Sequence, residues 1–351
     1  MALTKKQIEQ IRKELDECNN PLFFFDDDAD GLCSFLLLYR HKQEGKGVPM
    51  KTLPVLGMKL FPKIEEYSPD KIFVLDIPMI DQEFLDEIAK LKIPVIWIDH
   101  HGPYEREHVK YFNPRVDNPE ESPCVTSICY EVVDEPEDLW LAAIGIVADW
   151  QFMPILDDFS KKYSDLLPAE IKKPEDALFA SKLGKFVKIF SFILKGKLSE
   201  VYKCVKILTR IKDPYEILEK KTAQGKYIYD KYQEVNSVYD ELLNEAKAQK
   251  PKDNVLKYIY DESNSSFTKE LSNELLYLHP DNVILVARDK SGEIKMSLRS
   301  SKHNLKPALQ KALVGVEGYG GGHEHASGAC VKKEDFEVFL EQLKEALKEQ
   351  E

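Results

Sequence analysis

Short apolar runs that alternate with helical segments are the feature of this sequence that most constrains its fold. Three runs, at 21–25, 71–77 and 93–99, are almost continuously apolar, which is typical of strands covered on both faces. The segments between them at 31–43 and 80–91 have the length and pattern of helices. Strands that alternate with helices predict an α/β fold whose N-terminal part is a doubly wound, mostly parallel sheet.

Carboxylates stand where these apolar runs end. The acidic residues concerned are Asp26, Asp28, Asp30, Asp76, Asp99 and Asp149, and His100 and His101 directly follow Asp99. Open α/β sheets bind ligands beyond the carboxyl ends of their strands. One such aspartate could simply cap a helix. Its recurrence after several apolar segments predicts instead that these side chains share one site.

Clustered carboxylates need a cation, because they repel one another and raise one another's pKa until a positive charge neutralises them. Carboxylate oxygens joined by neutral imidazole suit Mn²⁺ or Mg²⁺, and the histidines favour Mn²⁺. Two such ions about 3.5–4 Å apart would clamp a phosphoryl group and activate a water. The pattern therefore predicts a two-metal phosphoryl site.

The sequence offers no thiolate to this set. Its cysteines never occur at C-x-x-C spacing and mostly have apolar neighbours, which is typical of reduced thiols in a core. They are Cys18, Cys33, Cys124, Cys129, Cys204 and Cys330. A structural zinc site is therefore disfavoured.

These motifs, taken in order, resemble those of the DHH phosphoesterase superfamily, and most closely its RecJ-like exonucleases. The resemblance rests on D-x-D-x-D-G at 26–31, the isolated Asp76, the triplet at 99–101 followed by Asn113-Pro114, and G-x-x-x-D at 145–149. The first motif has Phe24 and Asp26 where many members carry a histidine, although RecJ-type nucleases also have an aspartate at the second of these positions.

The resemblance implies two ions, Mn²⁺ or Mg²⁺, and a role for each acidic residue. The first ion would be held by Asp30, Asp76, His100 and Asp149, and the second by Asp26, Asp28 and the bridging Asp76. His101 would face the scissile phosphate, and Asp99 would orient the histidines.

A glycine-rich run near the C-terminus resembles the substrate-binding domain that accompanies DHH domains. The implied substrate-binding residues are Arg299, Ser300, Gly320, Gly321, Gly322 and His323. Consecutive glycines let the backbone approach a ligand closely and present N–H groups to an anion. A flexible turn before the last strand is the simpler interpretation, and neither a G-x-G-x-x-G motif nor a common metal spacing with His325 and Cys330 is present.

Charge is distributed unevenly along the 351 residues. The net charge is -12, yet residues 182–226 carry twelve Lys or Arg against four acidic residues, a local +8. A solvated helical face explains such a run simply, and a surface that follows a phosphate backbone explains it more specifically. An acidic protein can therefore still be predicted to bind a polyanion.

Pattern changes along the chain predict three parts: a catalytic domain at 1–156, a helical connector at 157–250 and a smaller C-terminal α/β domain at 251–351. The active site is expected between the first and the last. No apolar run reaches the length of a membrane span, and the N-terminus lacks the apolar centre of a signal peptide, which predicts a cytoplasmic protein without membrane contact.

The predicted function is metal-dependent hydrolysis of single-stranded DNA or RNA, exonucleolytic and releasing 5′-mononucleotides, as the RecJ-like resemblance implies. An oligoribonuclease or cyclic-dinucleotide phosphodiesterase is the alternative with the same chemistry, and inorganic pyrophosphatase a weaker one. A non-catalytic DHH-fold replication or repair scaffold is the alternative from another class. The resemblance also implies a helicase or replication/repair partner, while polarity, DNA or RNA preference and oligomeric state stay open.

Overall fold

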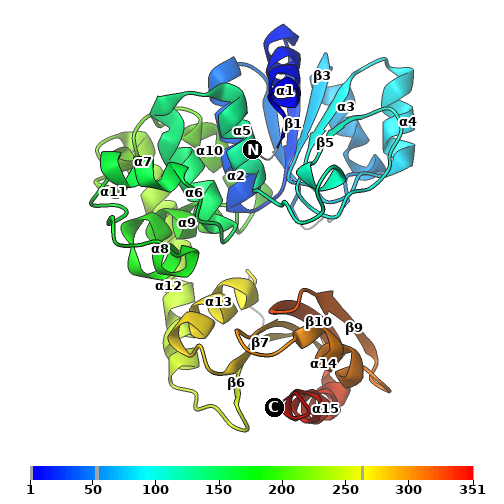
Figure 1. Ribbon diagram of the computed structural model, residues 1–351, viewed down its shortest axis with the longest axis vertical. Helices are drawn as coiled ribbons and strands as arrows, with labels where there is room; N and C mark the ends of the chain where they lie inside the picture. Colours follow the sequence, from blue (N-terminus) through cyan, green and yellow to red (C-terminus); the bar gives the residue numbers. More distant parts are fainter. Residues whose placement is uncertain (1–2, 52–54, 262–264, 351) are drawn as a thin grey trace. The chain divides into compact units, whose positions relative to one another are not determined.

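The computed structural model describes residues 3–51, 55–261 and 265–350 (Figure 1). These residues form two compact units, Met1–Gln233 and Glu234–Glu351. Each unit contains a five-stranded sheet together with helices, which confirms the predicted α/β class. None of the helices in the described ranges combines the length and the apolar character that crossing a membrane requires.

The sheet of the first unit is parallel throughout, with strand order β2-β1-β3-β4-β5. Its strands are β1 (Pro21–Phe25), β2 (Lys46–Pro49), β3 (Lys71–Leu75), β4 (Val95–Ile98) and β5 (Lys110–Phe112). The strand order reverses at β1, so the doubly wound topology is confirmed and its switch point lies between β1 and β3. The sequence patterns missed β2 and β5, because both are short and begin with exposed residues.

Helices cover both faces of this sheet. Along β1, Phe23 and Phe25 contact Phe35 of α2 (Ala29–Lys42) on one face, with ring centroids 5.5 and 4.9 Å apart. Phe24 points the other way and packs on Phe84 of α4 (Gln82–Lys90). The run of phenylalanines thus fills two cores at once, which explains its continuous apolar character.

Twelve helices belong wholly or partly to the described part of the first unit. Besides α2 and α4 they are α1 (Lys5–Glu17), α3 (Phe61–Tyr67), α5 (Val125–Val133), α6 (Leu139–Ala148), α7 (Ile155–Lys162), α8 (Pro174–Ala180), α9 (Lys182–Ile193), α10 (Leu198–Leu208), α11 (Pro214–Leu218) and α12 (Ala223–Lys247), with 3-10 turns at Met58–Leu60, Pro114–Val116 and Pro136–Asp138. The apolar α6 packs between α2, α5 and α9, so the first helices after residue 157 extend this core. The predicted domain boundaries after 156 and 250 stay a prediction.

The second unit has a mixed sheet of order β6-β7-β8-β10-β9. Its elements are β6 (Val255–Asp261), α13 (Thr268–Leu278), β7 (Val283–Lys290), β8 (Glu293–Arg299), α14 (Leu305–Ala312), β9 (Gly318–Gly322), β10 (Ala326–Lys332), a 3-10 turn at Lys333–Asp335 and α15 (Phe336–Lys348). β7 and β8 form a hairpin, and its turn residues Ser291 and Gly292 have positive φ. One sheet face packs against α14 and α15, and α13 packs on β7 and β8.

Three sequence expectations need correction. The glycine run is not a loop, because residues 318–322 form the edge strand β9, paired with β10. The first helix after β1 begins at Ala29 rather than at Gly31. Asp149 does not follow a strand but stands at the C-terminal end of α6, because its apolar segment is a buried helix.

Candidate metal centre

Three neighbouring strands deliver the acidic residues to one edge of the first sheet. Asp26 and Asp28 follow β1, Asp76 follows β3, and Asp99 begins the triplet after β4. These are the carboxyl ends of adjacent parallel strands at and beside the switch point, where this topology places ligands. Asp76 adopts a left-handed conformation with φ 60°, which an L-residue other than glycine rarely takes.

Asp28 and Asp30 are fixed by the start of α2 and of α5. The Asp28 carboxylate caps α2, accepting hydrogen bonds from the N–H groups of Asp30 (3.0 Å) and Gly31 (3.2 Å). Asp30 is buried and accepts from the N–H groups of Val125 (3.0 Å) and Thr126 (2.7 Å). Burial and the charge of Asp28 nevertheless raise the pKa of Asp30 to about 7. The two helix starts therefore aim two carboxylates at one place.

Asp76 shows the strongest sign of a missing positive charge. The residue is 3% exposed, and its Oδ1 accepts no hydrogen bond from any described residue. Burial, and then the charges of Asp30 and Asp28, raises its pKa well above the usual range. A buried carboxylate oxygen without a partner is costly unless a cation neutralises it. The residues present therefore fit a hard divalent cation.

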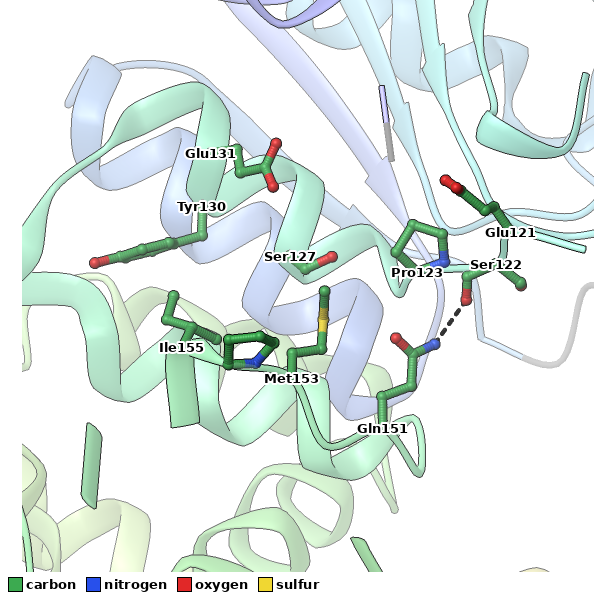
Figure 2. A pocket seen from close by; sticks show the side chains of 10 residues that line it. Glu121, Ser122, Pro123, Ser127, Tyr130, Glu131, Gln151, Met153 and Ile155 are labelled. Atoms are coloured by element: carbon green, nitrogen blue, oxygen red, sulfur yellow. Dashed lines mark hydrogen bonds between the residues drawn. The ribbon is translucent and has the colours of Figure 1, made fainter. Parts of the chain in front are cut away.

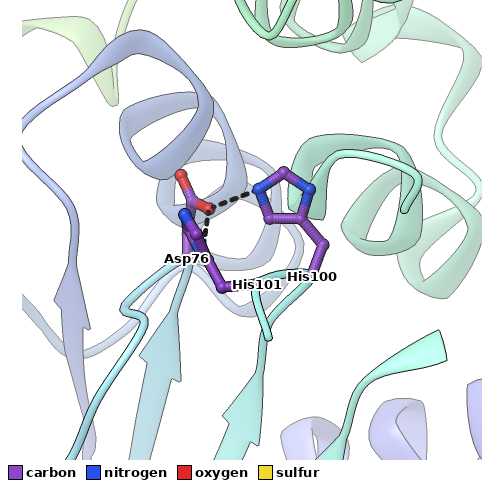
Figure 3. A group of neighbouring side chains, drawn as sticks. All are labelled: Asp76, His100 and His101. Carbon is purple, nitrogen blue, oxygen red and sulfur yellow. Dashed lines mark ion pairs between the residues drawn. The ribbon is translucent and has the colours of Figure 1, made fainter. Parts of the chain in front are cut away.

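The two histidines lie within ion-pair distance of this oxygen (Figure 3). His100 Nε2 is 3.3 Å from Asp76 Oδ1, and His100 Nδ1 is 3.7 Å from Asp149 Oδ2. Burial, and then the neighbouring His101, lowers the pKa of His100, which favours the neutral imidazole that binds metals. Ser122 Oγ donates to the His100 carbonyl at 3.1 Å and fixes this backbone.

His101 is held from behind by Asp99. Its Nδ1 lies 2.8 Å from Asp99 Oδ1, and its N–H donates to Asp99 Oδ2. Burial acts to lower the pKa of His101, but this hydrogen bond and the charges of Asp99, Asp26 and Asp28 together outweigh burial, so the pKa is raised overall. Asp99 is fully buried and also accepts from Tyr111 and Asn113. This arrangement fixes the His101 ring while its side chain stays 42% exposed.

Three sets of ligand atoms are close enough to share an ion, each with its atoms within 4.8 Å of one another. They are Asp26/Asp28/Asp76, Asp76/His100/His101 and Asp30/Cys124/Asp149. The first is the ligand set that the resemblance implied for one ion. For the other ion the resemblance implied Asp30, Asp76, His100 and Asp149. These four residues are divided between the remaining two sets, which also include His101 and Cys124. The individual ligand roles remain predictions.

Gly145 allows Asp149 to approach Asp30. A Cβ at Gly145 would stand 2.1 Å from Thr126 Oγ1, and this hydroxyl donates to the Asp30 carbonyl at 3.0 Å. α6 therefore packs closely against the start of α5. Gln151 then donates to Asp149 Oδ2 at 2.8 Å and fixes that carboxylate.

An open pocket of about 630 Å³ lies beside the metal-ligand candidates, between the start of α5 and the segment that leads into α7 (Figure 2). Gln151 and Ser122, which contact Asp149 and His100, belong to its wall and are joined by a 2.7 Å hydrogen bond from Gln151 Nε2 to the Ser122 carbonyl. Its other polar lining includes Glu121 and Glu131, and none of the described residues that line it is a Lys or Arg. A phosphate would therefore find no positive partner among them.

The predicted substrate-binding residues of the second unit differ in accessibility. Gly320, Gly321 and Gly322 are exposed along the edge strand, and His323 is exposed directly after it. Arg299 instead donates its Nε to Asn273 Oδ1 at 2.6 Å, and burial lowers its pKa to about 10.

Ser300 is buried in its own turn. Its hydroxyl accepts hydrogen bonds from the N–H groups of Lys302 and His303. The glycines thus offer free surface, whereas Ser300 is occupied inside the unit.

Sequence reasoning missed the residues that support the centre. Ser122, Gln151 and Thr126 contact the aspartates and histidines from helix starts and loops, and no motif indicates them. The sequence pattern predicts a core thiol at Cys124, whereas the structure places its Sγ close to Asp30, whose carboxylate binds the start of α5.

Comparison with known families identifies both units. The DHH family, N-terminal domain, matches residues 22–167, and the DHHA1 domain matches residues 254–349. The chain belongs to the DHH superfamily. A search of curated proteins finds no match to this DHH protein.

Solved structures show the same fold at low identity. RecJ from Thermus thermophilus in complex with Mn²⁺ has a TM-score of 0.71 and 16% identity over 99% of this chain and 56% of RecJ. The DHH protein thus spans little more than half of that relative, which has also been solved with Mg²⁺. An exonuclease RecJ bound to manganese has a TM-score of 0.64 and 17% identity over 99% of this chain and 96% of its own.

A smaller enzyme shares the fold as well. The pGpG-specific phosphodiesterase PggH from Vibrio cholerae has a TM-score of 0.50 and 14% identity, over 95% of this chain and 100% of its own. The likenesses establish a RecJ-like fold for this DHH protein.

Proposed function

We propose that this DHH protein is a metal-dependent phosphodiesterase that degrades single-stranded DNA or RNA from an end, releasing 5′-mononucleotides. The observation that carries the proposal is the buried Oδ1 of Asp76, which accepts no hydrogen bond from the described residues and is surrounded by aspartates from two further strand ends and by His100. This oxygen requires a cation, and a cation among several carboxylates can accept a phosphate that the acidic edge alone would repel. The RecJ-like fold supports the same chemistry.

Each part of the centre has a proposed task. Asp30, Asp76, His100 and Asp149 would hold one Mn²⁺ or Mg²⁺ ion, and Asp26, Asp28 and Asp76 a second. When bound, the ions would supply charge stabilisation and lower the pKa of water. His101, oriented by Asp99, would contact the scissile phosphate through the ring nitrogen that Asp99 does not occupy.

The basic segment supports a polymeric substrate less strongly than its charge count suggests. Several of its lysines form ion pairs with acidic residues, two of which, Asp165 and Asp230, lie outside the segment. The pairs are Lys182 with Asp165, Lys220 and Lys226 with Asp230, and Lys221 with Glu219. Tertiary structure therefore neutralises part of the +8.

One face of α10 keeps its charge. The α10 face is defined here by Lys203 and Lys206 on the helix and by Arg210, which lies two residues after its end at Leu208. All three are exposed, and no ion pair of theirs occurs in the described part of the chain. Lys203 lies over the Tyr227 ring, 4.2 Å from its centroid, which orients the ammonium without neutralising it. We propose this α10 face as the part of the first unit that follows the phosphate backbone.

The deciding experiment is a hydrolysis assay with Mn²⁺ on 5′- and 3′-labelled DNA and RNA strands of several lengths. The proposal expects mononucleotides that accumulate from one end, and no product with Asp76→Ala. Absence of hydrolysis on every substrate, with Mn²⁺ bound, would favour the non-catalytic scaffold.

The second candidate is a phosphodiesterase for dinucleotides, which the ion-paired lysines and the fold of PggH favour. Strand binding at several salt concentrations separates the two. Each phosphate contact contributes about -0.7 to the slope of log K against log salt. Replacing Lys203, Lys206 and Arg210 by Gln should flatten this slope, whereas the matched change of the paired Lys182 and Lys226 should not. An unaltered slope in both variants would favour the dinucleotide substrate.

A further inference from the structure

We propose that Cys124 is a sulfur ligand of this metal centre, so that the position shared by Asp30 and Asp149 binds thiophilic divalent cations such as Zn²⁺, Cd²⁺ or Co²⁺. The inference rests on the proposed metal centre and adds a ligand and a metal class to it. It replaces the sequence-based expectation that no thiolate accompanies the carboxylates.

The distances support one shared ion. The Cys124 Sγ and one carboxylate oxygen each of Asp30 and Asp149 lie within 4.8 Å of one another. Zinc bonds of about 2.3 Å to sulfur and 2.0–2.2 Å to oxygen allow two ligand atoms of one ion to be separated by at most about 4.5 Å. A small movement of the side chains would therefore close the three atoms around a cation.

The backbone holds Cys124 at this position. Its N–H donates to Gln151 Oε1 at 3.1 Å, and its carbonyl accepts from Ser127 Oγ at 2.8 Å. The same Gln151 side chain donates to Asp149 Oδ2 at 2.8 Å. One amide group thus links the Cys124 backbone to the carboxylate of one of its two proposed partner ligands.

The other partner, Asp30, is linked to Cys124 through the chain itself. The next two N–H groups after Cys124, of Val125 and Thr126, are those that bind the Asp30 carboxylate. The three residues of the proposed ligand set therefore belong to one hydrogen-bonded unit.

An independent observation requires a cation here. Asp76 Oδ1 is buried and accepts no hydrogen bond from the described residues. His100 connects it to the Cys124 set, with Nε2 3.3 Å from Asp76 Oδ1 and Nδ1 3.7 Å from Asp149 Oδ2. The need for positive charge thus arises from a residue other than the cysteine.

Donor chemistry then determines which metal benefits. Carboxylates alone suit Mn²⁺ and Mg²⁺, whereas thiolate selects softer cations. On binding, the S–H bond breaks, the proton passes to the buffer, and a sulfur–metal bond forms without any change of oxidation state. Zn²⁺ and Cd²⁺ should therefore compete with Mn²⁺ for this position.

Cobalt reports sulfur ligation directly. Titration of the full chain with Co²⁺ should produce the near-ultraviolet thiolate-to-cobalt charge-transfer band. Cys124→Ser should abolish the band, weaken Cd²⁺ binding about tenfold or more, and retain the Mn²⁺ stoichiometry measured by calorimetry. Cys33→Ser and Cys129→Ser are matched controls, since both thiols are buried but belong to none of the three ligand sets formed by the described residues; both should keep the band.

The outcomes separate this inference from the proposed function. Binding of Mn²⁺ and Co²⁺ without the charge-transfer band, or a band that persists in Cys124→Ser, would overturn the role of Cys124 and leave the phosphodiesterase proposal intact. A band that depends on Cys124 in a protein that hydrolyses nothing would support the sulfur ligand and overturn the enzymatic function. Failure to bind either ion would overturn both.

Discussion

The candidate metal centre of the first unit is built from side chains, whereas the glycine strand of the second unit offers mainly backbone. The candidate centre consists of buried and half-buried side chains at the ends of three parallel strands and of α6, held by hydrogen bonds. The strand β9 offers backbone, exposed at the edge of a mixed sheet and nearly free of side chains. A substitution in the candidate centre should therefore lower turnover, whereas a substitution in the strand should obstruct the approach of a ligand and raise KM.

The largest expected effect is that of Asp76→Ala. The change removes the proposed bridging ligand, so turnover should fall by at least about 10³-fold, because each ion contributes several kcal/mol of charge stabilisation. Calorimetry should show a lower Mn²⁺ stoichiometry. The metal-free protein should keep its fold, since mutual repulsion among the remaining carboxylates decreases. As a control, Asp289→Ala removes an acidic residue of the second unit that pairs with Lys333, and it should leave the Mn²⁺ stoichiometry unaltered.

His101→Ala should have the next largest effect. If His101 contacts the phosphate, kcat should fall by about 10²-fold or more while both ions stay bound. Metal content measured by mass spectrometry distinguishes this role from ligation. Loss of an ion would assign His101 to the set that it forms with Asp76 and His100.

Gly321→Ala tests the exposed backbone. A Cβ at Gly321 would meet nothing within 4 Å, so the fold should be unaffected. If the strand binds substrate through N–H groups, loss of one such contact should raise KM about two- to tenfold with kcat unchanged. The neighbouring Gly322 has φ +141° and would place a Cβ 2.5 Å from the Ala326 carbonyl, so Gly322→Ala should lower the melting temperature. An unchanged KM for Gly321→Ala would remove β9 from the substrate site.

The smallest effect should be that of Glu14→Gln. The Glu14 carboxylate is neutralised by Lys71 and Lys110, whereas the Asp76 carboxylate has no lysine or arginine partner among the described residues. Although burial acts to raise it, the pKa of Glu14 is lowered by hydrogen bonds from Lys110 and Lys71. A lowered folded-state pKa stabilises the protein above the unfolded value of 4.5, and this stabilisation disappears as the pH falls through the folded value.

At neutral pH, Glu14→Gln should therefore lower the free energy of unfolding by about 1–3 kcal/mol. Urea denaturation at several pH values should show the difference from the parent protein shrinking below pH 4.5. A difference independent of pH would mean that packing, and not the lysines, accounts for the loss.

The sequence by itself determined the class of fold and the chemical character of the centre. Continuous apolar runs alternating with helical segments required a covered parallel sheet, and β1, β3 and β4 lie where the pattern predicted them. Because parallel strands end at a common edge, aspartates after each run had to come together. Residue type and spacing carry this information locally.

Tertiary structure alone decided which distant residues join the candidate ligand set, which lysines are neutralised and how the glycine run is paired. Packing of α6 on α5 at Gly145 brings Asp149 and Cys124 to Asp30, although 95 residues separate Asp30 from the start of α5. Asp165 likewise forms an ion pair with Lys182, which looked unopposed within its own segment. Glycines that resemble a loop form an edge strand, because pairing with β10 supplies the hydrogen bonds that their own sequence does not encode. These outcomes depend on contacts between segments far apart in the chain, which local patterns cannot specify.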